Sequence, residues 1–126
     1  MILTIDPGDS RPIYQQVADG IKSLIARGEL KEGASLPPVR QIAADLAVNL
    51  NTIATAYREL QEEGLITIKH GQGATVCARK PPQKNADDLR KPLRTALTDL
   101  ILAGLSPTRI RALVADELND LMRGVK

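Results

Sequence analysis

The most informative segment of the sequence is Leu36–Val76, which reads LPPVRQIAADLAVNLNTIATAYRELQEEGLITIKHGQGATV. Apolar residues recur at helical spacing from Val39 to Leu46, and the two prolines before them favour the start of a helix. The repeat breaks over a few small and polar residues and resumes from Ile53 to Leu60. These patterns predict two short helices joined by a tight turn.

The hydrophobic period changes after Gly64, a residue type that commonly ends helices. Residues 65–69 alternate with a period of two, which predicts a strand, and residues 74–77 have the pattern of a returning strand. The segment between them, 70–73, contains two glycines and is typical of a hairpin turn.

A further helix is expected before this stretch. Apolar residues recur at spacings of three and four from Ile13 to Ile25, with Ser10 as the expected N-cap and Gly28 close to the end. The apolar stripe of this helix needs a partner surface. The expected order over residues 1–78 is therefore helix, helix, helix, hairpin, in one domain.

The C-terminal part of the chain predicts a linker and two more helices. Residues 79–85 are expected to be the linker, because 79–84 are polar and rich in proline. Within 86–126, one apolar helical pattern ends at Gly104, and Ser106 and Pro107 begin a second. Two isolated amphipathic helices bury too little apolar surface to be stable, so they are expected to pack on a partner chain or on the first domain. A homodimer formed through this two-helix region is the simplest solution.

The composition excludes several classes of protein. The 126 residues are 43% hydrophobic, with no Trp, no Phe and two Tyr, so the core must be aliphatic. No apolar run is long enough to cross a bilayer, and we expect a soluble, cytoplasmic protein. One cysteine, Cys77, and one histidine cannot form an internal disulfide or a zinc site, so no metal and no cofactor are expected.

The charge is distributed unevenly. Residues 1–78 contain seven Lys or Arg and nine Asp or Glu, whereas residues 79–126 contain ten and six. Nucleic-acid binding usually shows as a basic excess in the binding domain. The charge count therefore argues mildly against DNA binding by the first domain, and that function must be argued from motifs.

The order of elements is that of a winged helix-turn-helix domain, in which the second helix of the pair enters the major groove. The motifs also resemble the GntR family of bacterial repressors over about residues 10–77. The residues that carry the resemblance are Pro12–Val17, Gly28–Leu30, Leu36–Ala43, Val48–Ile53, Tyr57–Leu60 and Glu63–Ile66. The start of the third helix and the short tail resemble the YtrA-like subfamily, which lacks a large ligand-binding domain. The implied fold class is mostly α with a small β-hairpin, followed by the two-helix dimerisation tail.

The resemblance implies a set of DNA-contacting residues. Short polar side chains at the start of the third helix suit base edges or phosphates, and an early arginine of the second helix suits phosphate or guanine. A glycine at the tip of the hairpin, the wing, lets the backbone approach the DNA. The candidates are Arg40, Asn49, Asn51, Thr52, Thr55, Arg58, Lys69, His70, Gly71 and Gln72.

Structural roles compete with contact roles at several positions. Asn49 is equally suited to cap the third helix, Arg40 and Arg58 to be solvated charges, and His70 to be an ordinary turn residue. Tyr57 is expected in the core. Cys77 is expected to be packed and unreactive.

Three residues depart from the family pattern. Ala47 stands where a glycine is usual, and a left-handed alanine costs about 1 to 2 kcal/mol. Leu50 occupies a position that is often basic, which removes a phosphate contact. Pro38 replaces a small polar cap but keeps a rigid helix start.

These observations favour a repressor that binds a palindromic DNA operator as a homodimer. One alternative is a ligand sensor whose small-molecule effector binds near the tail or between subunits, although the tail offers little for a pocket. Another is a protein-interaction module, which conspicuous apolar residues in place of Asn49, Asn51 and Thr55 would favour. No phosphate-binding loop, metal cluster or paired nucleophile and base suggests an enzyme.

Overall fold

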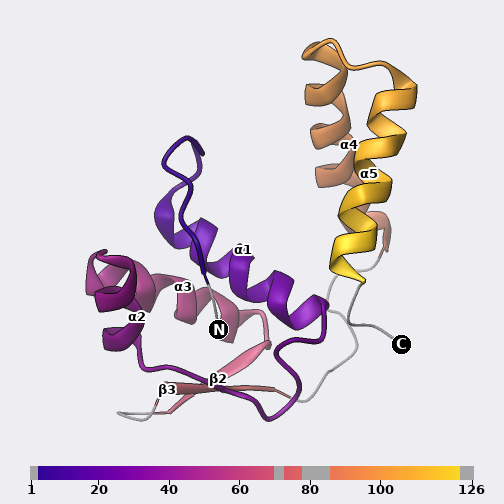
Figure 1. The fold of residues 1–126 in the computed structure, drawn as a ribbon. Coiled ribbons are helices and arrows are strands. Elements are labelled where there is room, and N and C mark those ends of the chain that lie inside the picture. Colours follow the sequence, from indigo (N-terminus) through magenta and orange to yellow (C-terminus); the bar gives the residue numbers. More distant parts are fainter. Residues whose placement is uncertain (1–2, 70–72, 78–85, 123–126) are drawn as a thin grey trace. The chain divides into compact units, whose positions relative to one another are not determined.

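The computed structural model describes residues 3–69, 73–77 and 86–122 (Figure 1). The chain divides into two compact units, residues 1–80 and 81–126. The predicted linker, 79–85, lies outside the described residues.

The first unit begins its regular structure with α1 (Ile13–Ala26). The middle of its predicted apolar stripe, Val17, Ile21 and Leu24, is buried, whereas Ile13 at its start is exposed and Ile25 at its end is half-buried. The predicted N-cap at Ser10 is wrong, because the helix starts directly after Pro12 and no side chain caps it. The fixed φ of proline sets the entry into the first turn instead, with Pro12 at φ −55°.

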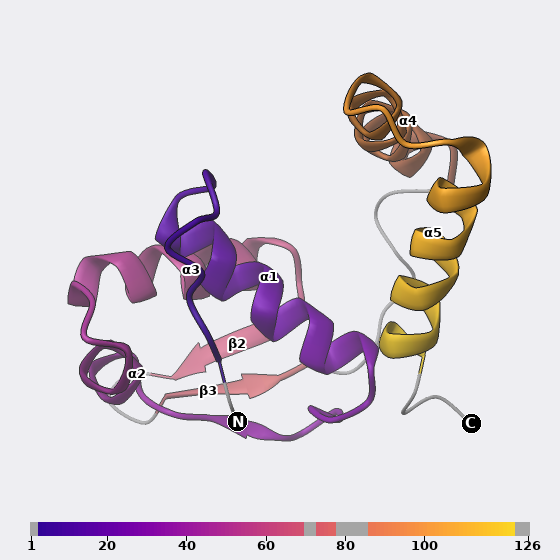
Figure 2. The same cartoon turned by 45° about the horizontal axis from the view of Figure 1, so that its top comes forward.

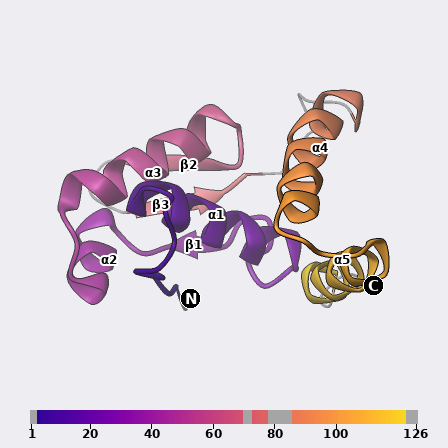
Figure 3. The same ribbon diagram turned by 90° about the horizontal axis from the view of Figure 1, so that it is seen from above.

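The two helices of the segment Leu36–Val76 are α2 (Val39–Leu46) and α3 (Leu50–Glu62). Ala47 joins them in the left-handed conformation, with φ 56° and ψ 44°, as predicted. Asn49 caps α3, because its side-chain oxygen accepts a hydrogen bond of 2.7 Å from the backbone N–H of Asn51. Figure 3 shows α2 beside the N-terminal end of α3.

A small antiparallel sheet closes the first unit. β2 (Ile66–Lys69) and β3 (Gly73–Val76) form the predicted hairpin, with Thr67 opposite Thr75. A third strand, β1 (Ser35–Leu36), pairs with the other edge of β3 and gives the order β1-β3-β2. Figure 2 shows β2 and β3 beneath α1 and α3. The sequence does not predict β1, because two residues are too few to show a period.

The core lies between α1, α2, α3 and the sheet. It is aliphatic except for one aromatic residue, Tyr57, which is fully buried as predicted. The other buried members of this cluster are Val17, Ala18, Ile21, Leu36, Ile42, Ala43, Ile53, Ala56, Leu60, Ile66 and Ala74. One face of α3 is therefore buried in the core of the first unit, and its opposite face is exposed.

The second unit consists of α4 (Ala86–Leu102) and α5 (Pro107–Leu121). The side chain of Ser106 caps α5 by accepting a hydrogen bond of 3.2 Å from the N–H of Arg109. Neither helix has a buried residue. Figure 3 shows that α4 and α5 lie at an angle to each other and are not packed side by side along their length. Within the described ranges, no helix is long and apolar enough to cross a membrane.

Candidate nucleic-acid interface

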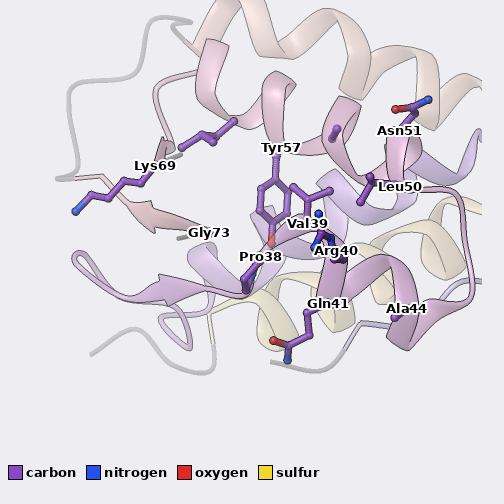
Figure 4. Close-up of a pocket in the computed structure, with 12 residues that line it drawn as sticks. Pro38, Val39, Arg40, Gln41, Ala44, Leu50, Asn51, Tyr57, Lys69 and Gly73 are labelled. Carbon is purple, nitrogen blue, oxygen red and sulfur yellow. The ribbon is translucent and has the colours of Figure 1, made fainter. Parts of the chain in front are cut away.

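A groove of about 750 Å³ lies between α2, α3 and the β2–β3 hairpin (Figure 4). Its lining is mainly apolar and also includes several polar side chains. The residues that line it are Pro38, Val39, Arg40, Gln41, Ala44, Leu50, Asn51, Ala54, Tyr57, Ile68, Lys69 and Gly73. We call this surface the α2–α3 groove.

The α2–α3 groove has the charge that a DNA-binding surface needs. Arg40 and Lys69 are cationic, and none of the lining residues is acidic. The nine acidic residues of 1–78 lie outside this lining. The negative charge count of the first domain therefore conceals an acid-free surface, and it is no objection to DNA binding.

The structure brings three of the predicted contact residues together at the groove. Arg40 comes from the start of α2, Asn51 from the start of α3, and Lys69 from the end of β2. All three side chains are exposed. A backbone or base edge lying along the groove would meet these two cations and the amides of Asn51 and Gln41.

Four other predicted contact residues belong to α3 or its cap but do not line the groove. Asn49 and Arg58 are exposed, whereas Thr52 and Thr55 are half-buried. Asn49 is the helix cap, so its side-chain oxygen is engaged and its amide N–H₂ group is left for other partners. The remaining candidates, His70, Gly71 and Gln72, lie outside the described residues.

The hydroxyl of Thr55 is already partly engaged inside α3. It donates a hydrogen bond of 2.9 Å to the backbone carbonyl of Asn51, one turn earlier. Its oxygen can still accept a hydrogen bond. Thr55 is thus better suited to a donor, such as a base amino group, than to a phosphate oxygen.

Tyr57 fixes the start of α2 against α3. Its hydroxyl donates a hydrogen bond of 2.6 Å to the backbone carbonyl of Pro37, directly before α2. Burial raises the pKa of the Tyr57 phenol, so the hydroxyl keeps the proton that it donates. Because Arg40 is in the first turn of α2, this bond helps to set its position relative to Asn51.

Gln61 holds the hairpin to α3 in a similar way. Its side-chain oxygen accepts a hydrogen bond of 2.8 Å from the backbone N–H of Ile68 in β2. Lys69 follows directly in the strand. This role of Gln61 does not follow from the sequence, because an exposed glutamine near the end of a helix carries no pattern that points to a strand.

The groove also has an apolar side that the sequence did not predict. Leu50 and Ala54 lie one turn apart on α3, and Ile68 lies on β2. The residue pattern does not reveal this role of Leu50. It lies three residues before Ile53 and seven before Tyr57, which is the spacing of the core stripe, so the sequence assigns it to the buried face of α3.

The described residues hold no cluster of three or more side chains suited to a metal. Cys77 is half-buried, and its sulfur lies 3.0 Å from the hydroxyl oxygen of Thr67. Cys77 is therefore less enclosed than the packed role expected for it.

Three helices followed by a hairpin, with a tight turn between the second and third helices, define a winged helix-turn-helix DNA-binding domain. The sequence signature of the bacterial regulatory proteins of the gntR family matches residues 13–76. The chain therefore belongs to the GntR family, whose members are transcription regulators and not enzymes.

Two relatives define the subfamily. The chain is 29% identical to the HTH-type transcriptional repressor YtrA of Bacillus subtilis over 99% of its own length and 98% of that protein. The structure of YtrA from Sulfolobus acidocaldarius, a GntR-family transcription factor, matches with a TM-score of 0.61 at 35% identity, over 81% of this chain and 99% of that one. The chain is YtrA-like within the family.

Two further solved structures are similar. A transcriptional antiterminator from Listeria monocytogenes EGD-e matches with a TM-score of 0.83 at 27% identity, over 97% of this chain and 93% of that one. The DNA-binding domain of AraR, solved in complex with the operator ORX1, matches with a TM-score of 0.53 at 27% identity, over 60% of this chain and 93% of that one. The chain is a DNA-binding transcription regulator.

Proposed function

We propose that this protein is a repressor that binds a palindromic operator as a homodimer. The observation that carries the proposal is the convergence of Arg40, Asn51 and Lys69, from three different elements, on an acid-free groove. In this arrangement the start of α3 enters the major groove of the DNA, and the β2–β3 hairpin lies against the flanking backbone.

The side chains divide the work according to their chemistry. Arg40 and Lys69 neutralise phosphates, which fixes the register of the protein on the duplex without selecting a sequence. Asn51 presents an amide that suits the N6 and N7 edge of adenine. Asn49, Thr52, Thr55 and Arg58 supply further contacts along α3, and His70, Gly71 and Gln72 supply those of the wing tip.

The homodimer is proposed from the second unit. Its two helices bury no residue within the chain. Six of their large apolar side chains, and Met122 directly after α5, are 40% to 79% exposed. These are Leu89, Leu93, Ile101, Leu102, Leu113, Leu118 and Met122. A second copy presents an equally apolar surface. A two-fold dimer places its two winged helix-turn-helix domains on the two halves of an inverted repeat.

Repression follows from occupancy of an operator that overlaps a promoter. The name of the Bacillus subtilis relative, a transcriptional repressor, supports this direction of control. Because such an operator is part of the chromosome, we place the protein in the cytoplasm. This mechanism of repression requires no small-molecule effector.

The test is selection of binding sites from a pool of randomised DNA duplexes by the purified full-length protein. We expect an inverted repeat with half-sites about one helical turn apart, bound less tightly as salt rises. Asn51→Ala should lose the preference at one position of each half-site, whereas Asn119→Ala, which changes an exposed asparagine of α5, should keep it. Enrichment of no sequence, or of a site without symmetry, would contradict the proposal.

A further inference from the structure

Leu50 is an exposed leucine at the centre of a surface that is otherwise suited to DNA. It is the first residue of α3, and 46% of its surface is accessible. The cap formed by Asn49 fixes the backbone at this point, so the position of Leu50 is set by the helix start and not by packing of its own side chain. Exposure of a large apolar side chain at a helix start serves neither solubility nor the core.

The surroundings of Leu50 are also apolar. Figure 4 shows Leu50 on the α3 side of the groove, facing Val39 of α2. Ala44 and Ala54 complete this part of the lining. The side chains next to it that can form hydrogen bonds, Arg40 and Asn51, are exposed and stand at the rim. The groove therefore has an apolar patch within a cationic and amide-bearing border.

The border determines what kind of partner fits. With Arg40 and Lys69 present and no acidic residue in the lining, the electrostatic complement is a polyanion. Among the base edges exposed in the major groove of DNA, only thymine presents an apolar group, its C5 methyl. A leucine side chain against any other base edge would desolvate polar atoms without replacing their hydrogen bonds.

We propose that Leu50 is a specificity-determining residue that contacts the C5 methyl group of a thymine in each operator half-site. This inference rests on the proposed function, because it assumes that α3 enters the major groove. It assigns to Leu50 a positive role in place of the basic residue that is often found at this position. The protein then gains sequence preference at a position where the family resemblance implies a phosphate contact.

The test uses the full-length protein and the operator obtained by site selection. Each thymine of one half-site is replaced singly by deoxyuridine, which removes the methyl group and leaves base pairing and the polar edge unchanged. We expect one position at which the replacement weakens binding by about threefold to tenfold. In Leu50→Ala, the same replacement should have no effect. In Ile13→Ala, which shortens an exposed side chain of α1, the effect should persist.

The other possible results contradict either the role of Leu50 or the proposed function. If no thymine is sensitive to loss of its methyl group although the operator is bound specifically, the inference is wrong and the proposed function stands. If a sensitive thymine remains equally sensitive in Leu50→Ala, another residue contacts it and the inference is again wrong. If no DNA sequence is bound specifically, the proposed function fails and the inference fails with it.

Discussion

Ala47 is the only residue other than glycine with a positive φ among those that the structure describes. It ends α2 and sets the angle at which α3 leaves the turn, so its strain lies directly beside the DNA-binding surface. A left-handed alanine is disfavoured because its Cβ approaches the following carbonyl oxygen. Glycine avoids this contact.

Ala47→Gly should therefore raise the free energy of unfolding, by up to about 1 kcal/mol after the greater flexibility of glycine in the unfolded chain is allowed for. Urea denaturation at neutral pH measures the change. Ala44→Gly, the same replacement inside α2, is the matched control and should lower the free energy of unfolding by about 1 kcal/mol. If Ala47→Gly lowers the free energy of unfolding as Ala44→Gly does, Ala47 is not strained.

Tyr57 makes the stability of the first unit sensitive to alkaline pH. Burial raises the pKa of its phenol above the value of about 10 in the unfolded chain. The folded state thus binds this proton more tightly, and the contribution to stability is fully present below pH 10 and is lost as pH rises further.

Tyr57→Phe should lower the free energy of unfolding at pH 8 by about 1 kcal/mol, because the hydrogen bond to the Pro37 carbonyl is lost. The difference between wild type and variant should then shrink as pH rises above 10. Denaturation curves at pH 8, 9, 10 and 11 measure it. A difference that stays constant across this range would show that the phenol does not titrate as its burial requires.

The polar members of the site could be predicted from the sequence, and the apolar members could not. Arg40, Asn51 and Lys69 follow from residue type and from their places in the motif. Leu50 and Ile68 have no polar group, so a pattern analysis assigns such residues to a helix or strand face without a role. Their function depends on which residues lie opposite them, and this information exists only in the folded structure.

At the scale of elements, the position of the hairpin depends on a close contact between β1 and β3. A Cβ atom added at Gly73 would lie 2.5 Å from the backbone carbonyl oxygen of Leu36, and the φ of Gly73 is 82°. The contact involves backbone on both sides, so no side chain can move to relieve it. Glycine is required at the point where the hairpin returns toward the core.

Gly73→Ala should therefore displace the hairpin and lower the free energy of unfolding by about 2 to 3 kcal/mol. Gly33→Ala is a sharp control, because Gly33 has nearly the same φ, 85°, but no atom near the added Cβ. It should cost only about 1 to 2 kcal/mol, the strain of the left-handed conformation. Thermal unfolding followed by circular dichroism compares the two. Equal costs would mean that the contact with Leu36 is relieved easily.

The sequence predicted the five helices and the hairpin because each is long enough to show a period. It could not predict β1, whose two residues are held only by pairing with β3. It also placed the start of α1 wrongly. Ser10 is a good cap by residue type, but Pro12 imposes the backbone geometry that decides where the helix begins.

At the scale of the whole molecule, the proposed homodimer makes operator affinity depend on the apolar surface of α4 and α5. Leu93→Glu places a charge within the exposed apolar stripe of α4 and should convert the homodimer to a monomer. Each monomer has one DNA-binding domain and can bind only one half-site at a time. Affinity for the full operator should therefore fall by at least about a hundredfold. Analytical ultracentrifugation and titration of a labelled operator measure the two effects.

Thr95→Glu is the matched control, because it adds the same charge at an exposed polar position of the same helix. It should leave both the dimer and operator binding intact. A wild-type protein that sediments as a monomer at micromolar concentration, or a Leu93→Glu variant that stays dimeric, would contradict the assembly through these helices.

The acid-free groove within an acidic domain also has a consequence for the search for an operator in the cell. A chromosome offers on the order of 10⁶ to 10⁹ competing sites, and binding to them depends on neutralised phosphates. Because residues 1–78 hold seven basic and nine acidic residues, and Arg40 and Lys69 are the cations that line the groove, we expect the winged domain to neutralise few phosphates at such sites and to bind them weakly. Few copies would then be sequestered along the chromosome, and a small number of molecules per cell would be enough to keep an operator occupied.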